Sequence, residues 1–147
     1  MIRSLRVGSV GLTVALLSLA ALPPTPVRAQ GRTHALIVVG LGGAAEYRER
    51  FHAQAMSLRT ALTERHGIPA EDVVYLGERP EDAPGVIADK STRANILRVL
   101  GEISQRSAPL DRLLVILIGH GTSDRNETQF NVPGPDLTPA DFQLGLI

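Results

Sequence analysis

The chain has 147 residues, a length that suits a single domain. Its 15 basic and 15 acidic residues leave no net charge, and the basic residues are scattered, which argues against the electrostatic surface of a nucleic-acid-binding protein. Cysteine is absent, so these residues hold neither a disulfide framework nor a thiol nucleophile. Aromatic residues make up only 3% of the chain, which argues against a carbohydrate-binding or base-stacking surface.

Residues 1–29 have the pattern of a secretory signal peptide. Arg3 and Arg6 form a short basic start, residues 7–22 are almost entirely apolar, and a proline-rich stretch ends in Ala29, a small residue of the kind that a signal peptidase reads. We therefore expect residues 30–147 to form the mature protein, in the periplasm or outside the cell, with no stable membrane span after cleavage. The alternative is an uncleaved anchor, for which the apolar run is short.

The mature sequence alternates between strand and helix patterns. Continuous apolar runs, typical of strands covered on both faces, alternate with runs whose apolar residues recur at helical spacing. The expected elements, in chain order, are a strand at 35–40, a helix at 44–66 ended by Gly67, a strand at 73–76, a polar loop at 78–90, a helix capped by Ser91 or Thr92 and ended by Pro109, a strand at 113–118, and a long loop that leads to a helix start at Thr138, Pro139 and Asp141.

This β-α-β-α-β order predicts an α/β fold, a three-layer open sheet of parallel strands joined by right-handed crossovers. The third strand is the most apolar, and we expect Leu114 and Ile116 to lie in a central strand that is covered on both faces. The pattern stops as a further helix begins, which favours an incomplete sheet in a truncated protein. The alternative is a minimal three-stranded domain with a bare apolar edge.

A site is expected where the first and third strands end. In open α/β sheets, ligands bind at the carboxyl ends of the strands where the strand order reverses. With the order 2-1-3, the loop at 40–43 and the pair His120–Gly121 meet at that point. Gly40, Gly42 and Ala45 also have the G-x-G-x-x-A spacing of a dinucleotide-binding loop, with Glu78 as the ribose acid, but a glycine-rich strand-to-helix turn explains the spacing without a cofactor.

His120 and Gly121 are the candidate catalytic residues. An imidazole beside an unobstructed backbone N–H suits acyl transfer, because the histidine can move protons while the N–H stabilises an oxyanion. The alternative for His120 is a polar residue that caps the sheet edge. His34, His52 and His66 have no zinc spacing, and the last two are expected to be solvated on the first helix, so we expect no metal and no cofactor.

Together, these features resemble the first half of the caspase-like cysteine peptidase fold, which includes caspases, metacaspases and legumains. "VILIGHG" is similar to the strand that ends in the catalytic histidine, "HALIVVG" to the opening strand, and "STRANILRVL" to the helix before the histidine strand. The resemblance covers about residues 33–142. It implies that His120 is the general acid/base, that the Gly121 N–H is an oxyanion donor, and that the substrate is a peptide or protein. The nucleophilic cysteine of the family has no counterpart here.

Two other functions stay open at this point. The chain could be a non-catalytic exported binding domain that uses the polar loop from Thr122 to Asp136, or the N-terminal part of an α/β-type serine hydrolase whose serine lies downstream. In the absence of the cysteine, the caspase-like reading implies a truncated or inactive peptidase. The sequence sets neither the substrate specificity nor the oligomeric state.

Overall fold

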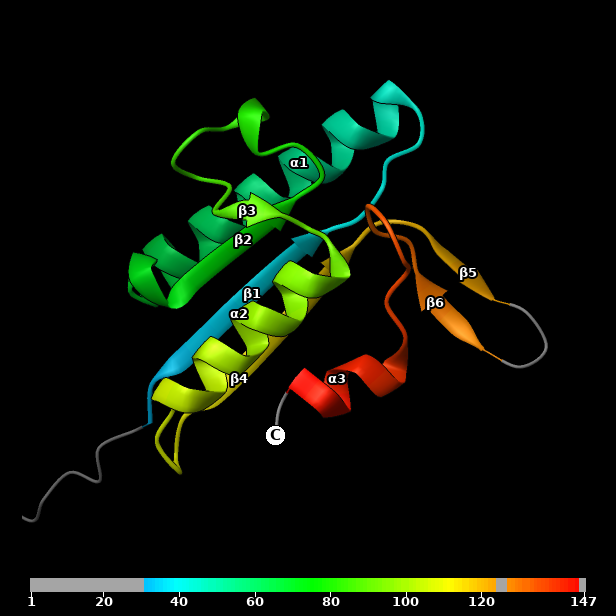
Figure 1. The fold of residues 1–147 in the computed structure, drawn as a ribbon. Coiled ribbons are helices and arrows are strands. Elements are labelled where there is room, and N and C mark those ends of the chain that lie inside the picture. The colour runs from blue at the N-terminus through cyan, green and yellow to red at the C-terminus, as the bar shows by residue number, and fades with distance from the viewer. Residues whose placement is uncertain (1–30, 124–126, 146–147) are drawn as a thin grey trace, which may run out of the picture.

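A computed structural model describes residues 31–123 and 127–145 (Figure 1). The expected signal peptide at 1–29 lies outside the described residues. The main elements, in chain order, are β1 (Thr33–Val39), α1 (Ala45–Thr60), β2 (Val73–Gly77), β3 (Asp89–Lys90), α2 (Arg93–Arg106), β4 (Arg112–Ile118), β5 (Gly121–Ser123), β6 (Thr128–Phe130) and α3 (Pro139–Gly145).

The main sheet is parallel and has the order β3-β2-β1-β4. The long strands β2, β1 and β4 therefore lie in the predicted 2-1-3 order. β1 pairs on both sides, with Ile37 opposite Tyr75 on one neighbour and opposite Ile116 on the other. Its residues from 34 to 39 are at most 3% exposed. A strand buried on both faces needs a continuous apolar run, which explains the "ALIVV" of β1.

Helices cover both faces of this sheet, so the prediction of an α/β fold with three layers is confirmed (Figure 1). Alternate residues of β1 face opposite ways. Ala35, Ile37 and Val39 pack with Ala55 of α1, whereas Leu36 and Val38 pack with the apolar face of α2. That face consists of Ile96, Val99, Leu100 and Ile103, and Phe142 of α3 packs against the same cluster.

The expectation that β4 is central is wrong for the part of the chain that the structure describes. β4 pairs there with β1 only and forms an edge of the sheet. Leu114 is 41% exposed and Leu117 is 39% exposed, while Ile116 is half-buried. An unbroken apolar run shows that a strand has two covered faces or an uncovered apolar edge, and the sequence pattern alone does not separate these cases.

Two of the predicted loops contain strands. The polar excursion after β2 includes the two-residue strand β3, which pairs with the end of β2. The long loop after β4 begins with an antiparallel hairpin of β5 and β6. These strands are too short for a period-2 apolar pattern to mark them.

The predicted helix boundaries are close to the observed ones. Gly67 has a φ of +65°, as expected for the glycine after a helix, although α1 first continues through a π-helical turn at Ala61–Arg65. Of the two candidate caps for α2, Thr92 caps it by accepting the Asn95 N–H at 3.3 Å. Ser91 instead donates to the Val39 carbonyl at 2.6 Å in the buried interior, which ties the start of α2 to the end of β1.

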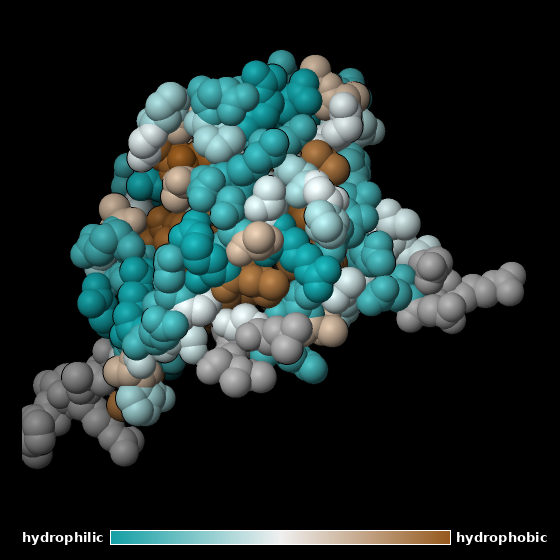
Figure 2. All heavy atoms as spheres, in the orientation of Figure 1, coloured by the Kyte–Doolittle hydropathy of each residue, from teal (hydrophilic) through white to brown (hydrophobic). Residues whose placement is uncertain are grey.

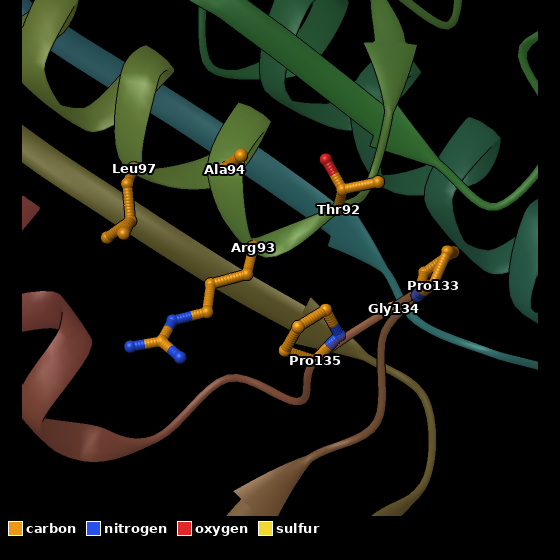
Figure 3. A pocket seen from close by; sticks show the side chains of 7 residues that line it. All are labelled: Thr92, Arg93, Ala94, Leu97, Pro133, Gly134 and Pro135. Atoms are coloured by element: carbon orange, nitrogen blue, oxygen red, sulfur yellow. The ribbon is translucent and has the colours of Figure 1, made fainter.

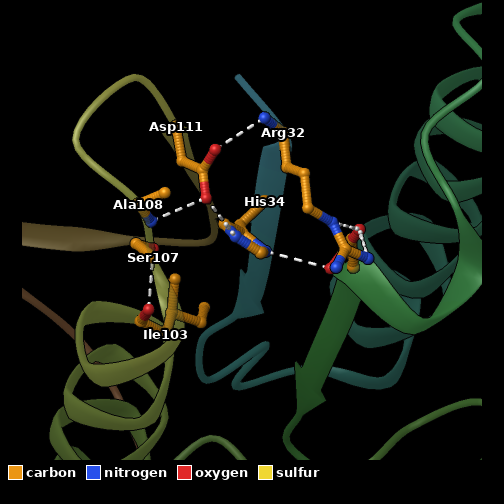
Figure 4. A network of polar contacts seen from close by, with 7 residues as sticks. Arg32, His34, Ile103, Ser107, Ala108 and Asp111 are labelled. Atoms are coloured by element: carbon orange, nitrogen blue, oxygen red, sulfur yellow. Dashed lines mark hydrogen bonds and ion pairs between the residues drawn. The ribbon is translucent and has the colours of Figure 1, made fainter. Parts of the chain in front are cut away.

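A charge cluster, formed by Arg32, His34, Asp72 and Asp111, holds the amino ends of the strands together (Figure 4). Its histidine and carboxylate side chains are buried, whereas the side chain of Arg32 is 60% exposed. The His34 ring is 2% exposed, with Nδ1 at 3.0 Å from Asp72 Oδ1 and Nε2 at 3.6 Å from Asp111 Oδ2, and neither ring nitrogen makes an aligned hydrogen bond. Asp72 also accepts from the Arg32 guanidinium. The cluster joins the start of β1 to the segments that precede β2 and β4.

The surface over α2 and α3 is mostly hydrophilic, with hydrophobic side chains visible in separate hollows (Figure 2). Within residues 31–123 and 127–145, no helix has the length and apolar character needed to cross a membrane.

Candidate functional site

The glycine turns after β1 and β4 meet at the carboxyl edge of the sheet, as predicted. The Gly40 N–H donates to the Ile118 carbonyl at 2.9 Å, and the Leu41 N–H donates to the Asn131 carbonyl at the same distance. A Cβ on Gly119 would lie 3.0 Å from the Phe130 ring and 3.3 Å from the Gly40 Cα. Glycine is needed here because the two strand ends and the Phe130 ring approach closely.

His120 is separated from the end of β4 by Gly119 and is exposed. Its carbonyl accepts the Asn131 N–H at 3.0 Å, which fixes the backbone against the hairpin. Its imidazole lies against two aromatic rings of α1. The ring centroids are 4.8 Å apart for Tyr47 and 5.1 Å apart for Phe51, and both contacts are T-shaped. The histidine thus combines an accessible surface with a defined ring environment.

Gly121 begins β5 opposite Phe130. Because the Asn131 N–H bonds to the His120 carbonyl, Gly121 and Phe130 form a non-hydrogen-bonded pair of the antiparallel ladder. The N–H of Gly121 therefore points away from β6 and is free of the ladder. The φ of Gly121 is not positive, so the backbone conformation does not require glycine here, but a Cβ would lie 2.9 Å from the Gln129 carbonyl oxygen.

The contacts of the loop after β1 argue against the alternative that this loop binds a dinucleotide. The Gly42 N–H, which a phosphate would need as a donor, bonds to Glu78 Oε2 at 2.9 Å. Arg48 Nη1 lies 3.6 Å from the other oxygen of the same carboxylate. A carboxylate in this place repels a phosphate and occupies its donor. Glu78 thus ties the end of β2 to the loop instead of binding a ribose.

One of the other histidines differs from the expectation. His66 is exposed, as predicted. His52 is half-buried, and its Nδ1 lies 2.9 Å from the Tyr75 hydroxyl. Burial, with a smaller effect of the Asp82 carboxylate, raises the pKa of Tyr75 to about 12, so its hydroxyl stays protonated at physiological pH. His34 is buried at the opposite edge of the sheet, in the charge cluster. In the described ranges, no three side chains come together as a metal site.

Two hollows border these residues. A polar one of about 370 Å³ is lined by Arg48, Glu49, His52, Arg79 and Asp82. A smaller one of about 270 Å³ lies beside Gly121 and is mainly apolar, with Leu117, Phe130, Leu137 and Phe142 in its lining. A third hollow, of about 570 Å³, lies between the start of α2 and the turn at 133–135, and contains neither His120 nor Gly121 (Figure 3).

Sequence reasoning placed His120 and Gly121 at this edge but missed the aromatic neighbours of the histidine. Tyr47 and Phe51 lie within the predicted helix at 44–66, and their helical spacing did not assign them to the site. Their spacing of four residues puts both rings on one side of α1. The sequence feature that could have indicated these neighbours is the residue type. The chain has only 3% aromatic residues, yet two of them lie one helical turn apart, soon after the first glycine loop.

No family model matches the chain, and no solved structure matches it. The chain is similar to Metacaspase-1 of Kluyveromyces lactis, with 29% identity over 117 residues. The match covers 78% of this chain, and the chain spans 26% of the length of that curated relative. A metacaspase is a caspase-like cysteine peptidase. The similarity is weak homology that supports a relationship to the caspase-like peptidases and does not distinguish a legumain-like branch.

Proposed function

We propose that this chain is the histidine-bearing part of a caspase-like cysteine peptidase, in which His120 is the general acid/base and the Gly121 N–H is an oxyanion donor. The cysteine nucleophile would come from residues beyond these 147, since none of them is cysteine. The observation that carries the proposal is the position of His120 at the carboxyl end of β4, next to the strand-order reversal between β1 and β4.

The geometry supports both roles. His120 is exposed, so a substrate can reach its ring. Gly121 directs its N–H away from the hairpin, where it can meet an oxygen that gains negative charge. In the proposed reaction, His120 takes the thiol proton and the thiolate attacks the peptide carbonyl carbon. The carbonyl oxygen becomes an oxyanion held by the Gly121 N–H, and His120 then gives the proton to the leaving amine. Hydrolysis of the acyl-enzyme completes the cycle.

Three finer features belong to the same proposal. We propose residues 30–147 as a partial caspase-like domain, residues 1–29 as a cleaved signal peptide, and a peptide or protein substrate met outside the cytoplasm. A legumain-like member of the family stays within the proposal, because "VILIGHG" and "STRANILRVL" resemble the histidine strand and preceding helix that the caspase-like branches share. Mass spectrometry of the exported protein tests the signal peptide, because a mature N-terminus at Gln30 is expected.

The experiment that tests the function uses the complete reading frame that encodes this chain. We expect it to continue through a helix and an apolar strand that ends in cysteine, and the expressed protein to cleave members of a fluorogenic peptide pool. Alkylation of the thiol should abolish cleavage. His120→Ala should lower kcat by about 10²–10⁴-fold, the range that a positioned general acid/base contributes.

His66→Ala is the matched control, because His66 is also exposed but follows the π-helical turn after α1 and precedes β2, whereas His120 lies at the carboxyl ends of the strands. It should leave the rate unchanged. His120→Ala should also keep the fold, with a change of less than about 1 kcal/mol in the free energy of unfolding, because the residue is exposed. Thiol-dependent cleavage that survives in His120→Ala would refute the proposal.

A further inference from the structure

His120 is exposed, yet its ring contacts two aromatic rings. An exposed side chain normally samples several rotamers, and a general acid/base needs one orientation within a narrow range. Among the described residues, no side chain hydrogen-bonds to either ring nitrogen of His120. The contacts that restrict the ring are the two T-shaped contacts with Tyr47 and Phe51, at 4.8 and 5.1 Å between centroids and with interplanar angles of 75° and 68°.

The two aromatic rings form a single wall on α1. They lie one turn apart, with centroids 6.0 Å from each other and planes at 39°. The Arg50 guanidinium lies 4.9 Å from the centre of the Tyr47 ring, a cation–π contact on the solvent side of the helix. One turn after Phe51, Ala55 is completely buried against the sheet. The wall is therefore attached to the core and is not a pair of loose surface side chains.

Two different elements thus contact the backbone and the ring of His120. The hairpin contacts the backbone, through the Asn131 N–H that bonds to the His120 carbonyl at 3.0 Å. Helix α1 contacts the ring, through Tyr47 and Phe51. T-shaped contacts of this kind favour a particular relative orientation of the rings, which a contact with aliphatic side chains of similar size does not impose.

We propose that Tyr47 and Phe51 are positioning residues that hold the imidazole of His120 in the orientation needed for proton transfer, while they leave both ring nitrogens available. The relevance to catalysis rests on the proposed function, whereas the orientation itself can be measured without it. The aromatic wall takes the place of a hydrogen-bonding side chain as the group that orients the histidine. Its contribution is to keep one rotamer populated before a substrate arrives.

The orientation is tested by NMR on the 147-residue chain, with the ring signals of His120 assigned by their loss in His120→Gln. In the unmodified chain, the side-chain couplings should report one dominant χ1 rotamer, and ring currents should displace the His120 ring protons from the shifts of the exposed His66. In the double variant Tyr47→Leu/Phe51→Leu, the couplings should average and the ring shifts should move toward those of His66. Tyr47→Phe keeps the ring and should preserve both signals.

Leu58→Ala is the control for general loss of packing. Leu58 lies on the same helix and packs against the same core cluster as Phe51, but it has no ring contact with His120. This variant should keep the His120 signals even if its melting temperature falls. If the double variant does not fold, His120→Ala gives the same information from the other side, because the Tyr47 and Phe51 ring protons should shift when the imidazole is removed.

A second readout uses the peptidase expressed from the complete reading frame. Tyr47→Leu/Phe51→Leu should lower kcat by up to about 10²-fold with little change in KM, and Tyr47→Phe should retain activity. An unchanged His120 rotamer and unchanged ring shifts in a folded double variant would overturn the inference, whether or not the protein is a peptidase. Conversely, a reoriented His120 in a protein without peptidase activity would overturn the proposed function and leave the positioning role intact.

Discussion

At the scale of single residues, the carboxylate of Asp72 is the group whose loss should cost most stability. It is 3% exposed and faces both the His34 ring and the Arg32 guanidinium. Because removal of one partner leaves the buried ring of His34 without its nearest carboxylate, Asp72→Asn should lower the free energy of unfolding by about 1–3 kcal/mol, the cost of leaving a buried polar group without its partner. Urea unfolding measures the change. Glu71→Gln, an exposed neighbour, is the control, and equal stability of the two variants would show that the cluster contributes little.

Asp111, on the other side of His34, has its own hydrogen bonds. The Ala108 N–H, the Arg32 N–H and the His34 ring together hold the pKa of the Asp111 carboxyl below its usual value, with the Ala108 bond as the largest effect. The carboxylate therefore stays charged at neutral pH. Figure 4 shows how it links the turn before β4 to the start of β1.

The carboxyl of Asp141 should make the stability of the fold depend on pH. Burial raises the pKa of its carboxyl, but hydrogen bonds from the Thr138 N–H and hydroxyl and the ion pair with Arg93 outweigh burial, and the net pKa lies below the usual value. A lowered pKa in the folded state means that the stabilisation is present at neutral pH. It is lost as the pH falls below about 4 and through the folded pKa.

Asp141→Asn should therefore lose about 1–3 kcal/mol of stability at pH 7, where hydrogen bonds to a charged group are intact. Unfolding curves between pH 7 and pH 2.5 measure the difference between the two proteins, which should shrink as the pH falls. The variant Asp136→Asn, which loses a carboxylate in the loop before α3, is unfolded over the same pH range for comparison. A difference that stays constant over the whole range would mean that the charge of Asp141 does not stabilise the fold.

At the scale of elements, β1 and β4 have similar apolar sequences but different surroundings. Ile37, in the middle strand, is completely buried, whereas Leu114, in β4, is 41% exposed. Ile37→Ala should cost about 2–5 kcal/mol, the range for a buried aliphatic residue. Leu114→Ala should cost about 1 kcal/mol, because much of its surface already contacts water. Denaturant unfolding of the two variants side by side checks this, and equal costs would place β4 in the interior of the sheet.

Helix α1 and the hairpin contribute different groups to the candidate site. α1 presents Tyr47 and Phe51 toward His120, and its first turns also line the polar hollow beside Arg79 and Asp82. The hairpin of β5 and β6 supplies the backbone contact to His120 and keeps the Gly121 N–H outside its ladder. The candidate site is thus assembled from the end of β4 and the hairpin that follows it, together with a helix that lies far earlier in the sequence.

At the scale of the whole molecule, the two ends of the parallel strands have separate roles. The charge cluster lies at the amino ends of the strands, and the glycine turns and His120 lie at their carboxyl ends. Changes at sites this far apart usually act independently. Asp72→Asn should therefore lower stability and leave the ring signals of His120 where they are.

We also predict that the 147 residues lack thiol-dependent peptidase activity on their own. Because the 147 residues include no cysteine, they should not hydrolyse peptides by a thiol mechanism on their own. Incubation with a peptide pool, with and without iodoacetamide, measures this. Cleavage that iodoacetamide blocks and that requires His120 would contradict the prediction, provided that His120→Ala stays folded in the same buffer.

The sequence by itself determined the layered α/β fold, the order of the long strands and the edge at which the glycine turns meet. These follow from apolar periodicity and from the handedness of strand–helix–strand units, which are local or nearly local properties. Glycines at 40, 119 and 121 marked close approaches, although the atoms that approach them were not evident from the chain.

Only the tertiary structure decided which strand is at the edge, which groups surround each histidine and which N–H is free. The number of strands that flank β4 depends on pairing over long distances, which the periodicity of one strand does not contain. The partners of His34, His52 and His120 come from other elements, up to 77 residues away along the chain in the case of His34 and Asp111. The direction of the Gly121 N–H depends on the register of a hairpin, because a shift of one residue reverses which groups face the partner strand.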